Sequence, residues 1–460
     1  MRILADPDQA LANGLAAIRE QFQVPASFPA DVLAAAEAAA ARAPTDYVDR
    51  TDRQFVTLDP ATSTDLDQAF AIEASGADLL LHYAIADVAW FVGDGDAIDA
   101  EAWRRGATLY LPDGKASLYP PVLSEGAASL LPDGPRPAAL FTVRVAADGA
   151  VRLDGAERAI VRSRAKLAYD SVRDDELPAG FAELSRRFEA AEDARGAARV
   201  DPPEQEVALA DGRFELRFRA RHESEARNAS LSLATNLAIA EALFAHHTGL
   251  FRVMAPPDGR AERRLRHSAR AFALDWPAAA PLAQFERTLD PADPRHAAFM
   301  HAIRRAGAGA SYAPFRHGER PWHAAVAAPY AHATAPLRRL ADRYVVRAAL
   351  AIANGETLPE AVSEAFARLP KVMAQADARG GSIERAVVDL AEAVMLDGSE
   401  GKDFEAVVTD IDERGARIQL CDLPVVARVD AHRVTPGDDV NVRLIEADPE
   451  RRTIRFQRVA

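Results

Sequence analysis

Residues 57–70 read TLDPATSTDLDQAF and place three carboxylates, Asp59, Asp65 and Asp67, directly after a short apolar run. The run at residues 55–58 has the composition of a β-strand, and the proline and small polar residues that follow predict a loop. A loop that leaves a rigid strand can turn all three carboxylates toward one point. Because carboxylate oxygens are the ligands that Mg²⁺ and Mn²⁺ prefer, the stretch predicts a metal site.

Other interpretations of this acidic loop remain open from its residues alone. A polar surface turn uses the same Asp, Thr and Ser side chains to bind local backbone N–H groups. A calcium loop of the helix-loop-helix type is disfavoured, because the stretch lacks the required glycine and distal glutamate. A metal-dependent sugar-nucleotide transferase can also use an Asp-x-Asp pair. The rest of the chain therefore has to decide between these functions.

The overall composition is that of a globular protein with several domains. The chain has 460 residues, of which 49% are apolar, and a formal net charge of −14. This charge argues against a protein that coats nucleic acid indiscriminately, although it leaves room for a local basic groove. The single Cys421 excludes an internal disulfide and a cysteine-based zinc cluster. Since we find neither a signal peptide nor an apolar run long enough to span a membrane, we expect a cytoplasmic protein without a membrane partner.

Hydrophobic spacing divides the first half of the chain into helices followed by strands. Residues 10–22 and 30–43 have helical spacing and predict a small N-terminal helical unit at residues 1–48, packed on the main body. After the acidic loop we expect strands near residues 69–72, 79–92, 140–145 and 151–153. Asp87 interrupts one of these apolar runs. It either caps a following turn or lies near the site.

Beyond Arg162 we expect mostly helix to about residue 393, including a long helix at residues 226–248. A further helix is predicted to open at Thr334, a suitable N-cap, with Pro336 in its first turn. It repeats arginine every fourth residue, at Arg339, Arg343 and Arg347. Such a stripe is usually a solvated surface, although arginine also suits phosphate wherever it lines a groove.

The last sixty residues predict a five-stranded OB-type β-barrel. Short alternating runs, separated by turn residues, occur at residues 404–408, 416–420, 425–429, 439–444 and 453–456. Barrels of this type hold single-stranded nucleic acid by aromatic stacking and a charged groove. Phe404 and Phe456 could either stack on bases or fill the barrel core.

Taken in order, these features resemble the motifs of the ribonuclease II / ribonuclease R (RNB) family. The matching stretches are the acidic loop and residues 84–87, 109–112, 165–170, 332–339 and 384–385. The closing barrel is similar to the S-one type RNA-binding domain of that family. The resemblance implies an α+β fold, in which an RNB-type catalytic domain with a mixed sheet and surrounding helices occupies residues 49–398 and the barrel occupies residues 399–460.

The resemblance also implies a function and a set of site residues. Members of the family are processive 3′→5′ exoribonucleases that hydrolyse single-stranded RNA to nucleoside 5′-monophosphates with Mg²⁺, for which Mn²⁺ can substitute, and we expect a monomer. Asp59, Asp65 and Asp67 would be metal ligands, and Asp67 and Arg338 would be catalytic. The expected RNA contacts are Tyr110, Tyr169, Thr334, Arg339 and Glu384.

Two departures from the family pattern favour a second hypothesis, a catalytically silent RNA-binding relative, and a third concerns only access to the site. Gln68 stands where the family has a fourth aspartate, and Ala229 and Ser230 stand where it has acidic residues that contact the strand. The residues before the acidic loop are also too few for the tandem cold-shock barrels that are common in the family.

Overall fold

A seven-stranded mixed sheet forms the body of the molecule. The computed structural model describes residues 2–3, 9–197, 202–210, 213–219, 221–307, 309–412, 414–430 and 432–459. At each edge of the sheet the outermost strand is parallel to its neighbour, and all the other neighbouring strands are antiparallel. The strand order is β10 (Ser163–Ala168), β3 (Phe55–Asp59), β4 (Gln68–Ser75), β5 (Asp78–Ala86), β8 (Arg136–Val145), β9 (Val151–Val161) and β2 (Val48–Asp49). The predicted mixed sheet is therefore confirmed.

Helices cover the sheet and close its core. The helices α5 (Phe181–Arg195) and α6 (Glu223–Ala245) pack on β8, and α6 also reaches β3 and β9. Helix α10 (Leu340–Ala353) packs against α6 and β9. The long helix predicted at residues 226–248 is thus confirmed. None of the helices in the described ranges is both long enough and apolar enough to cross a membrane.

The predicted strand at residues 79–92 is correct only as far as Ala86. After Asp87 the chain turns into the short helix α3 (Val88–Phe91). The buried Asp87 carboxylate accepts a hydrogen bond from the Tyr47 hydroxyl at 2.6 Å and lies 3.2 Å from Nε of Arg158. Asp87 occupies the N-cap position of α3, but its side chain makes no capping hydrogen bond, so the capping role expected from the sequence is wrong. The alternative, a place near the site, stays a prediction, and the backbone N–H of the preceding Ala86 donates a hydrogen bond of 2.9 Å to the backbone oxygen of Asp67.

The expectation of mostly helix beyond residue 162 is wrong at several strands. In addition to β10, a hairpin forms from β11 (Glu204–Ala210) and β12 (Arg213–Arg219), with β1 (Arg2–Ile3) beside β12. The strands β13 (Leu250–Val253) and β14 (Ser311–Pro314) pair with each other, and the chain between them forms a group of three helices. These helices are α7 (Gly259–Ala271), α8 (Leu282–Glu286) and α9 (Pro294–Ala306), which share a core of their own.

The two predicted N-terminal helices are present and pack against the main body. Helix α2 (Ala30–Ala40) joins the core of the sheet, near α4 (Ala97–Arg105) and the π-helical turn Leu123–Ala127. Helix α1 (Ala10–Gln21) packs on α11 (Glu360–Leu396) instead. The division of the chain at residues 48/49 and 398/399 stays a prediction.

Helix α1 also contacts a small hairpin made of β6 (Leu109–Leu111) and β7 (Gly114–Ala116). The guanidinium of Arg19 donates two parallel hydrogen bonds, of 3.0 and 2.8 Å, to the carboxylate of Asp113 in the turn of this hairpin. Paired bonds of this kind fix orientation as well as distance. The α1 helix therefore sets the position of the β6–β7 turn.

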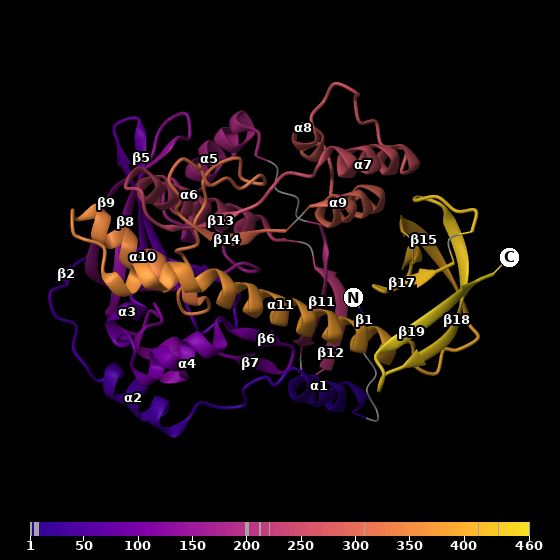
Figure 1. The fold of residues 1–460 in the computed structure, drawn as a ribbon, viewed down its shortest axis with the longest axis horizontal. Coiled ribbons are helices and arrows are strands. Elements are labelled where there is room, and N and C mark those ends of the chain that lie inside the picture. Colours follow the sequence, from indigo (N-terminus) through magenta and orange to yellow (C-terminus); the bar gives the residue numbers. More distant parts are fainter. Residues whose placement is uncertain are drawn as a thin grey trace.

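Helix α11 has 37 residues and connects the main body to the C-terminal barrel (Figure 1). The barrel strands are β17 (Val426–Val429), β16 (Gly415–Leu420), β15 (Asp403–Asp412), β18 (Asp439–Asp448) and β19 (Thr453–Arg458), in that spatial order. These strands confirm the predicted five-stranded barrel. Phe456 is only 5% exposed and its ring centroid lies 5.9 Å from that of Phe404, which supports the core role for this pair.

Glu392 connects three parts of the fold and is almost fully buried. Its Oε1 accepts hydrogen bonds from the backbone N–H of Val426 in the barrel at 2.8 Å and from Nε2 of Gln205 in the β11–β12 hairpin at 2.7 Å. Burial raises the pKa of Glu392 to about 8, although these two hydrogen bonds lower it. A neutral Glu392 therefore suits this junction better than a charged one.

We expect the substitution Glu392→Gln to stabilise the protein at alkaline pH. Because the folded-state pKa is raised, the stability linked to protonated Glu392 is fully present below the unfolded pKa of about 4.3 and is lost as the pH rises through about 8. Glutamine keeps the Oε1 acceptor and carries no charge. In thermal melts at several pH values, the melting temperature of the variant minus that of wild type should therefore increase as the pH rises through this window. A difference that does not change with pH would contradict the assignment.

Candidate active site

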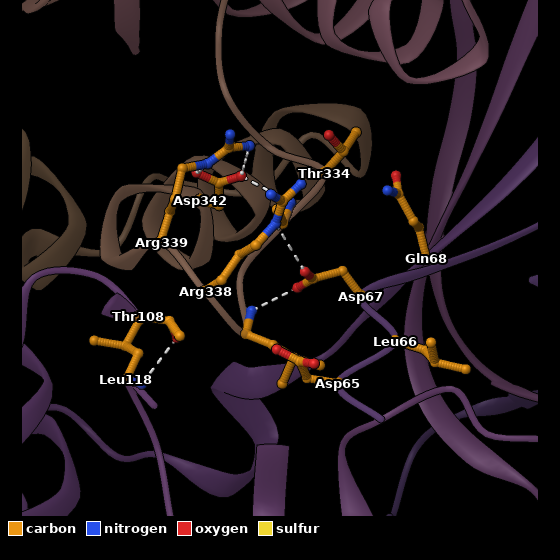
Figure 2. A network of polar contacts seen from close by, with 12 residues as sticks. Asp65, Leu66, Asp67, Gln68, Thr108, Leu118, Thr334, Arg338, Arg339 and Asp342 are labelled. Atoms are coloured by element: carbon orange, nitrogen blue, oxygen red, sulfur yellow. Dashed lines mark hydrogen bonds and ion pairs between the residues drawn. The ribbon is translucent and has the colours of Figure 1, made fainter. Parts of the chain in front are cut away.

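Asp67 lies where the acidic loop meets the segment at residues 331–339 (Figure 2). Its Oδ1 accepts a hydrogen bond from the backbone N–H of Leu337 at 2.6 Å, and its Oδ2 lies 3.4 Å from Nε of Arg338. Asp67 is 4% exposed, and burial raises its pKa to about 8 even though Arg338 and the Leu337 amide lower it. The two predicted catalytic residues are therefore brought into contact, with the carboxylate held in a fixed orientation.

The segment that carries Arg338 is fixed by hydrogen bonds to helix α6. The buried Thr334 hydroxyl shares a hydrogen bond of 2.8 Å with Ser232 and accepts one of 3.2 Å from Nδ2 of Asn236. Asn236 also accepts from the backbone N–H of Ala333 at 2.9 Å. Because the Thr334 hydroxyl bonds across to α6 and not to its own following turn, the predicted helix start at Thr334 is wrong, and α10 begins at Leu340. Thr334 supports the loop from behind.

Arg339, predicted to contact RNA, forms an internal ion pair. Its guanidinium donates hydrogen bonds of 3.0 and 2.8 Å to the two carboxylate oxygens of the fully buried Asp342, which also accepts from the backbone N–H of Ala335 (Figure 2). Further along α10, Arg343 is buried against Asp99. The idea that this arginine stripe is a solvated surface is therefore wrong, because Arg339 is paired with Asp342 of α10 itself and Arg343 with Asp99 of α4.

Arg339→Ala should destabilise the protein strongly. The change would leave the Asp342 carboxylate buried without its cation, and removing one partner of a buried ion pair costs about 3–5 kcal/mol. Urea unfolding measures this loss of unfolding free energy. The matched control is Arg186→Ala, which removes an arginine whose side chain is 68% exposed and paired with Glu183 on the surface of α5, and it should change the unfolding free energy far less. Equal effects of the two variants would argue against a bracing role for Arg339.

Asp59 and Asp65 differ in how their carboxylates are satisfied. The Oδ2 of Asp59 is buried and has no hydrogen-bond partner, and burial raises the pKa of Asp59 to about 7, opposed by Arg338. Asp65 instead lies 2.7 Å from Nζ of Lys115 and accepts a hydrogen bond of 3.3 Å from the Tyr110 hydroxyl. Both of these partners belong to the β6–β7 hairpin. Lys115 was not predicted, because its only signal is a lone lysine in a turn.

The three carboxylates do not converge as the sequence suggested. In the described ranges, no group of three or more His, Cys, Asp or Glu side chains is arranged to hold a metal ion. Asp67 is engaged by Arg338 and Asp65 by Lys115, which leaves the unpartnered Oδ2 of Asp59. Mg²⁺ is commonly held by only one or two carboxylates together with water and substrate phosphate. Asp59, with Asp65 beside it, fits that smaller donor set.

The other predicted residues lie at different distances from this centre. Gln68 accepts a hydrogen bond from the buried Tyr83 hydroxyl inside the sheet. Burial, and after it the nearby Asp59 carboxylate, raises the pKa of Tyr169, whose hydroxyl accepts a hydrogen bond of 3.1 Å from Asn228 of α6. Asn228 had not been singled out from the sequence, although it directly precedes the two positions that lack the expected acids.

Tyr110 and Glu384 lie outside this buried centre. Tyr110 is 55% exposed, so its ring is open to a partner while its hydroxyl reaches Asp65. Glu384 lies on α11 and lines a separate cavity of about 690 Å³, together with Arg385 and with Arg417 of the barrel. The structure therefore does not bring Glu384 together with the other predicted residues.

Two family models match this chain. The family model of the RNB domain matches residues 47–354, and that of the RNase II-type exonuclease C-terminal S1 domain matches residues 402–459. The chain belongs to the RNB family. The resemblance inferred from the motifs is thus confirmed, and the terminal barrel of this RNB protein is the S1-type domain.

The RNB protein matches known ribonucleases over most of its own length. It is 26% identical over 500 residues to ribonuclease R of Aquifex aeolicus, covering 96% of this chain and 69% of that protein. It is also 26% identical over 442 residues to ribonuclease R 1 of Lactococcus lactis, covering 87% of this chain and 52% of that protein. The chain therefore spans between half and about two thirds of the length of these relatives.

A solved structure supports the same fold. Mycoplasma genitalium RNase R in complex with ribose-methylated single-stranded RNA superimposes with a TM-score of 0.86 at 20% identity, covering all of this chain and 79% of that one. At this identity the match establishes the fold. It confirms the predicted combination of a mixed α/β domain, a C-terminal barrel and N-terminal helices.

Proposed function

We propose that this RNB protein is a processive, metal-dependent 3′→5′ exoribonuclease that hydrolyses single-stranded RNA to nucleoside 5′-monophosphates. The observation that carries the proposal is the contact of the buried Asp67 with the half-exposed Arg338, beside the unpartnered Oδ2 of Asp59. Phosphodiester hydrolysis requires a fixed cation for the phosphate charge and a carboxylate that orients water or metal. The names of the matching ribonucleases support the same reaction.

Arg338 has the properties needed to hold the scissile phosphate. Its side chain is 45% exposed, and its Nε is the atom that faces Asp67. The other guanidinium N–H groups can bind two phosphate oxygens at once, which a lysine cannot do. The contact with Asp67 restricts the orientation of the guanidinium before RNA binds, so less freedom is lost on binding.

The remaining residues divide between metal and strand. Asp59 and Asp65 would hold Mg²⁺ or Mn²⁺, which supplies an activated water and positive charge for the phosphate. Tyr110 presents an exposed ring on which a terminal base can stack, and such stacking contributes about 1–3 kcal/mol per base regardless of its identity. Sequence-independent stacking suits an enzyme that moves along any RNA. Tyr169, held by Asn228 beside Asp59, would line the same strand.

A labelled RNA ladder tests this proposal. Purified protein and a 5′-labelled oligoribonucleotide should give Mg²⁺-dependent shortening from the 3′ end, and chelation of the metal should stop it. The same oligonucleotide as DNA should be spared if the site reads the 2′-hydroxyl. RNA that stays intact at every Mg²⁺ and Mn²⁺ concentration would overturn the enzymatic assignment.

The second candidate function is a catalytically silent RNA-binding protein. Two contacts favour it: the Gln68 side chain already accepts a hydrogen bond from the Tyr83 hydroxyl, and the Lys115 ammonium already forms an ion pair with Asp65. In that case RNA binding would be retained while metal-dependent turnover stays absent. Against it stands the buried Oδ2 of Asp59, which has no hydrogen-bond partner and is therefore free to bind a metal ion.

A further inference from the structure

The surface helix α7 carries a row of arginines along one side. With 3.6 residues per turn, positions three, four, seven and ten apart fall on one half of a helix. The opposite side, formed by Ala261, Leu265 and Ala269, is buried against α9. The exposed residues that we call the arginine face are Arg260, Arg263, Arg264 and Arg270.

The acid recorded nearest to the arginine face is Asp258, the N-cap residue of α7, which interacts electrostatically with Arg264 and Arg260 without forming an ion pair. In the part of the chain that the structure describes, none of these four guanidinium groups forms an ion pair or a side-chain hydrogen bond. Other exposed arginines do form ion pairs, for example Arg104 with Glu101, Arg173 with Asp175 and Arg186 with Glu183. In a chain with a net charge of −14, four arginines on one helix face with only Asp258 nearby are an unusual concentration of positive charge. Such a row attracts an external polyanion.

The packing of α7 argues against a membrane or an apolar groove as its partner. A basic amphipathic helix that inserts into a membrane, or docks in an apolar groove, must expose its apolar side. In α7 that side is occupied, because Leu265 and Ala269 are 3% and 1% exposed and lie in one core with Phe299 of α9. Only the charged face is available to a partner. Guanidinium groups in a row fit the repeated phosphates of a nucleic acid.

The position of α7 connects this face to the barrel. The C-terminal end of α7 touches the loop between β17 and β18, where a Cβ on Gly437 would lie only 3.0 Å from the backbone oxygen of Ala271. In the neighbouring helix, Nε of Arg305 donates a hydrogen bond of 3.0 Å to Asp410 of β15. Figure 1 shows α7 at the upper right, beside the barrel and away from the sheet.

We propose that the arginine face of α7 binds the phosphate backbone of the RNA strand that the C-terminal barrel holds. The ten residue steps from Arg260 to Arg270 extend about 15 Å, enough for several consecutive phosphates. The contact reads no base and adds length-dependent affinity outside the Asp67 site. The inference rests on the proposed function in taking RNA as the ligand and in having the barrel hold the strand.

The salt dependence of RNA binding tests this surface. We would measure the dissociation constant of full-length protein for an RNA of roughly 30 nucleotides, about twice the largest site of one OB barrel, in EDTA and at several salt concentrations. The triple variant Arg263→Gln/Arg264→Gln/Arg270→Gln should reduce the magnitude of the log–log salt slope by about 2, since each phosphate contact on a single strand contributes about 0.7.

The control variant Arg104→Gln/Arg173→Gln/Arg186→Gln makes the same change in net charge with arginines that are 66%, 67% and 68% exposed but paired with acids. It should leave the slope at the wild-type value. If the α7 variant and the control have the same slope, the proposal is wrong. Because EDTA prevents turnover, this result is separate from the RNA ladder: failure of the ladder removes the proposed enzyme activity, and failure of the slope removes the α7 contact.

Discussion

The substitution Asp67→Asn is expected to abolish RNA shortening while RNA binding is retained. Asparagine keeps the size of the side chain and can still accept the hydrogen bond from the Leu337 amide, but it carries no negative charge opposite Arg338. Loss of a carboxylate that orients water or metal lowers turnover by roughly 10²–10⁴-fold. Single-turnover cleavage with bound, labelled RNA measures this step, and RNA affinity in EDTA measures binding separately.

The control for Asp67→Asn is Asp148→Asn, the same chemical change in the exposed turn between β8 and β9. It should leave both the cleavage rate and the affinity at wild-type values. A wild-type cleavage rate for Asp67→Asn would show that this carboxylate takes no part in the reaction. Equal loss of binding and cleavage would instead assign Asp67 to holding the fold.

Arg338→Ala should lower turnover by about 10²–10³-fold, the range found when one preorganised donor to a developing negative charge is removed. The variant also loses the positive charge that lowers the pKa values of Asp59 and Asp67, so both carboxyl groups should titrate at higher pH. The rate profile should therefore rise at a more alkaline pH than in wild type, if these groups act as carboxylates.

Arg338→Lys separates charge from geometry at the same position. Lysine restores the positive charge and with it the pH profile, but a single ammonium cannot form the two parallel bonds of a guanidinium. We expect the pH shift to be reversed and the turnover to recover only in part. Full recovery of turnover would show that charge alone is sufficient. Arg173→Lys, on the exposed surface, is the control that should change neither property.

The local parts of the site could be predicted from the sequence, because each is a short pattern. The strand that ends at Asp59, the loop after it and the five barrel strands all follow from local composition, and the structure contains them. The β11–β12 hairpin also has a local signal of its own, since Phe214, Leu216 and Phe218 alternate with charged residues, a pattern typical of a strand.

The contacts that define the site could not be predicted, because they join distant segments. Leu337 and Asp67 are 270 positions apart, and Asn236 and Thr334 are 98 apart. Local preference made Thr334 a helix cap, but a hydrogen bond to α6 overrides that preference once the fold is formed. Likewise, Lys115 contacts Asp65 only because the fold brings their two segments together. No local pattern marks such pairs.

The Arg19–Asp113 pair connects the N-terminal helix α1 to the candidate active site. The hairpin whose turn Arg19 holds supplies both Tyr110 and Lys115 to Asp65, so α1 is mechanically coupled to one of the site carboxylates. The same helix end is tied to α11, where Arg379 donates a hydrogen bond of 2.7 Å to the backbone oxygen of Phe22. A ligand, fusion partner or truncation that displaces α1 would therefore act as a remote modulator of Asp65.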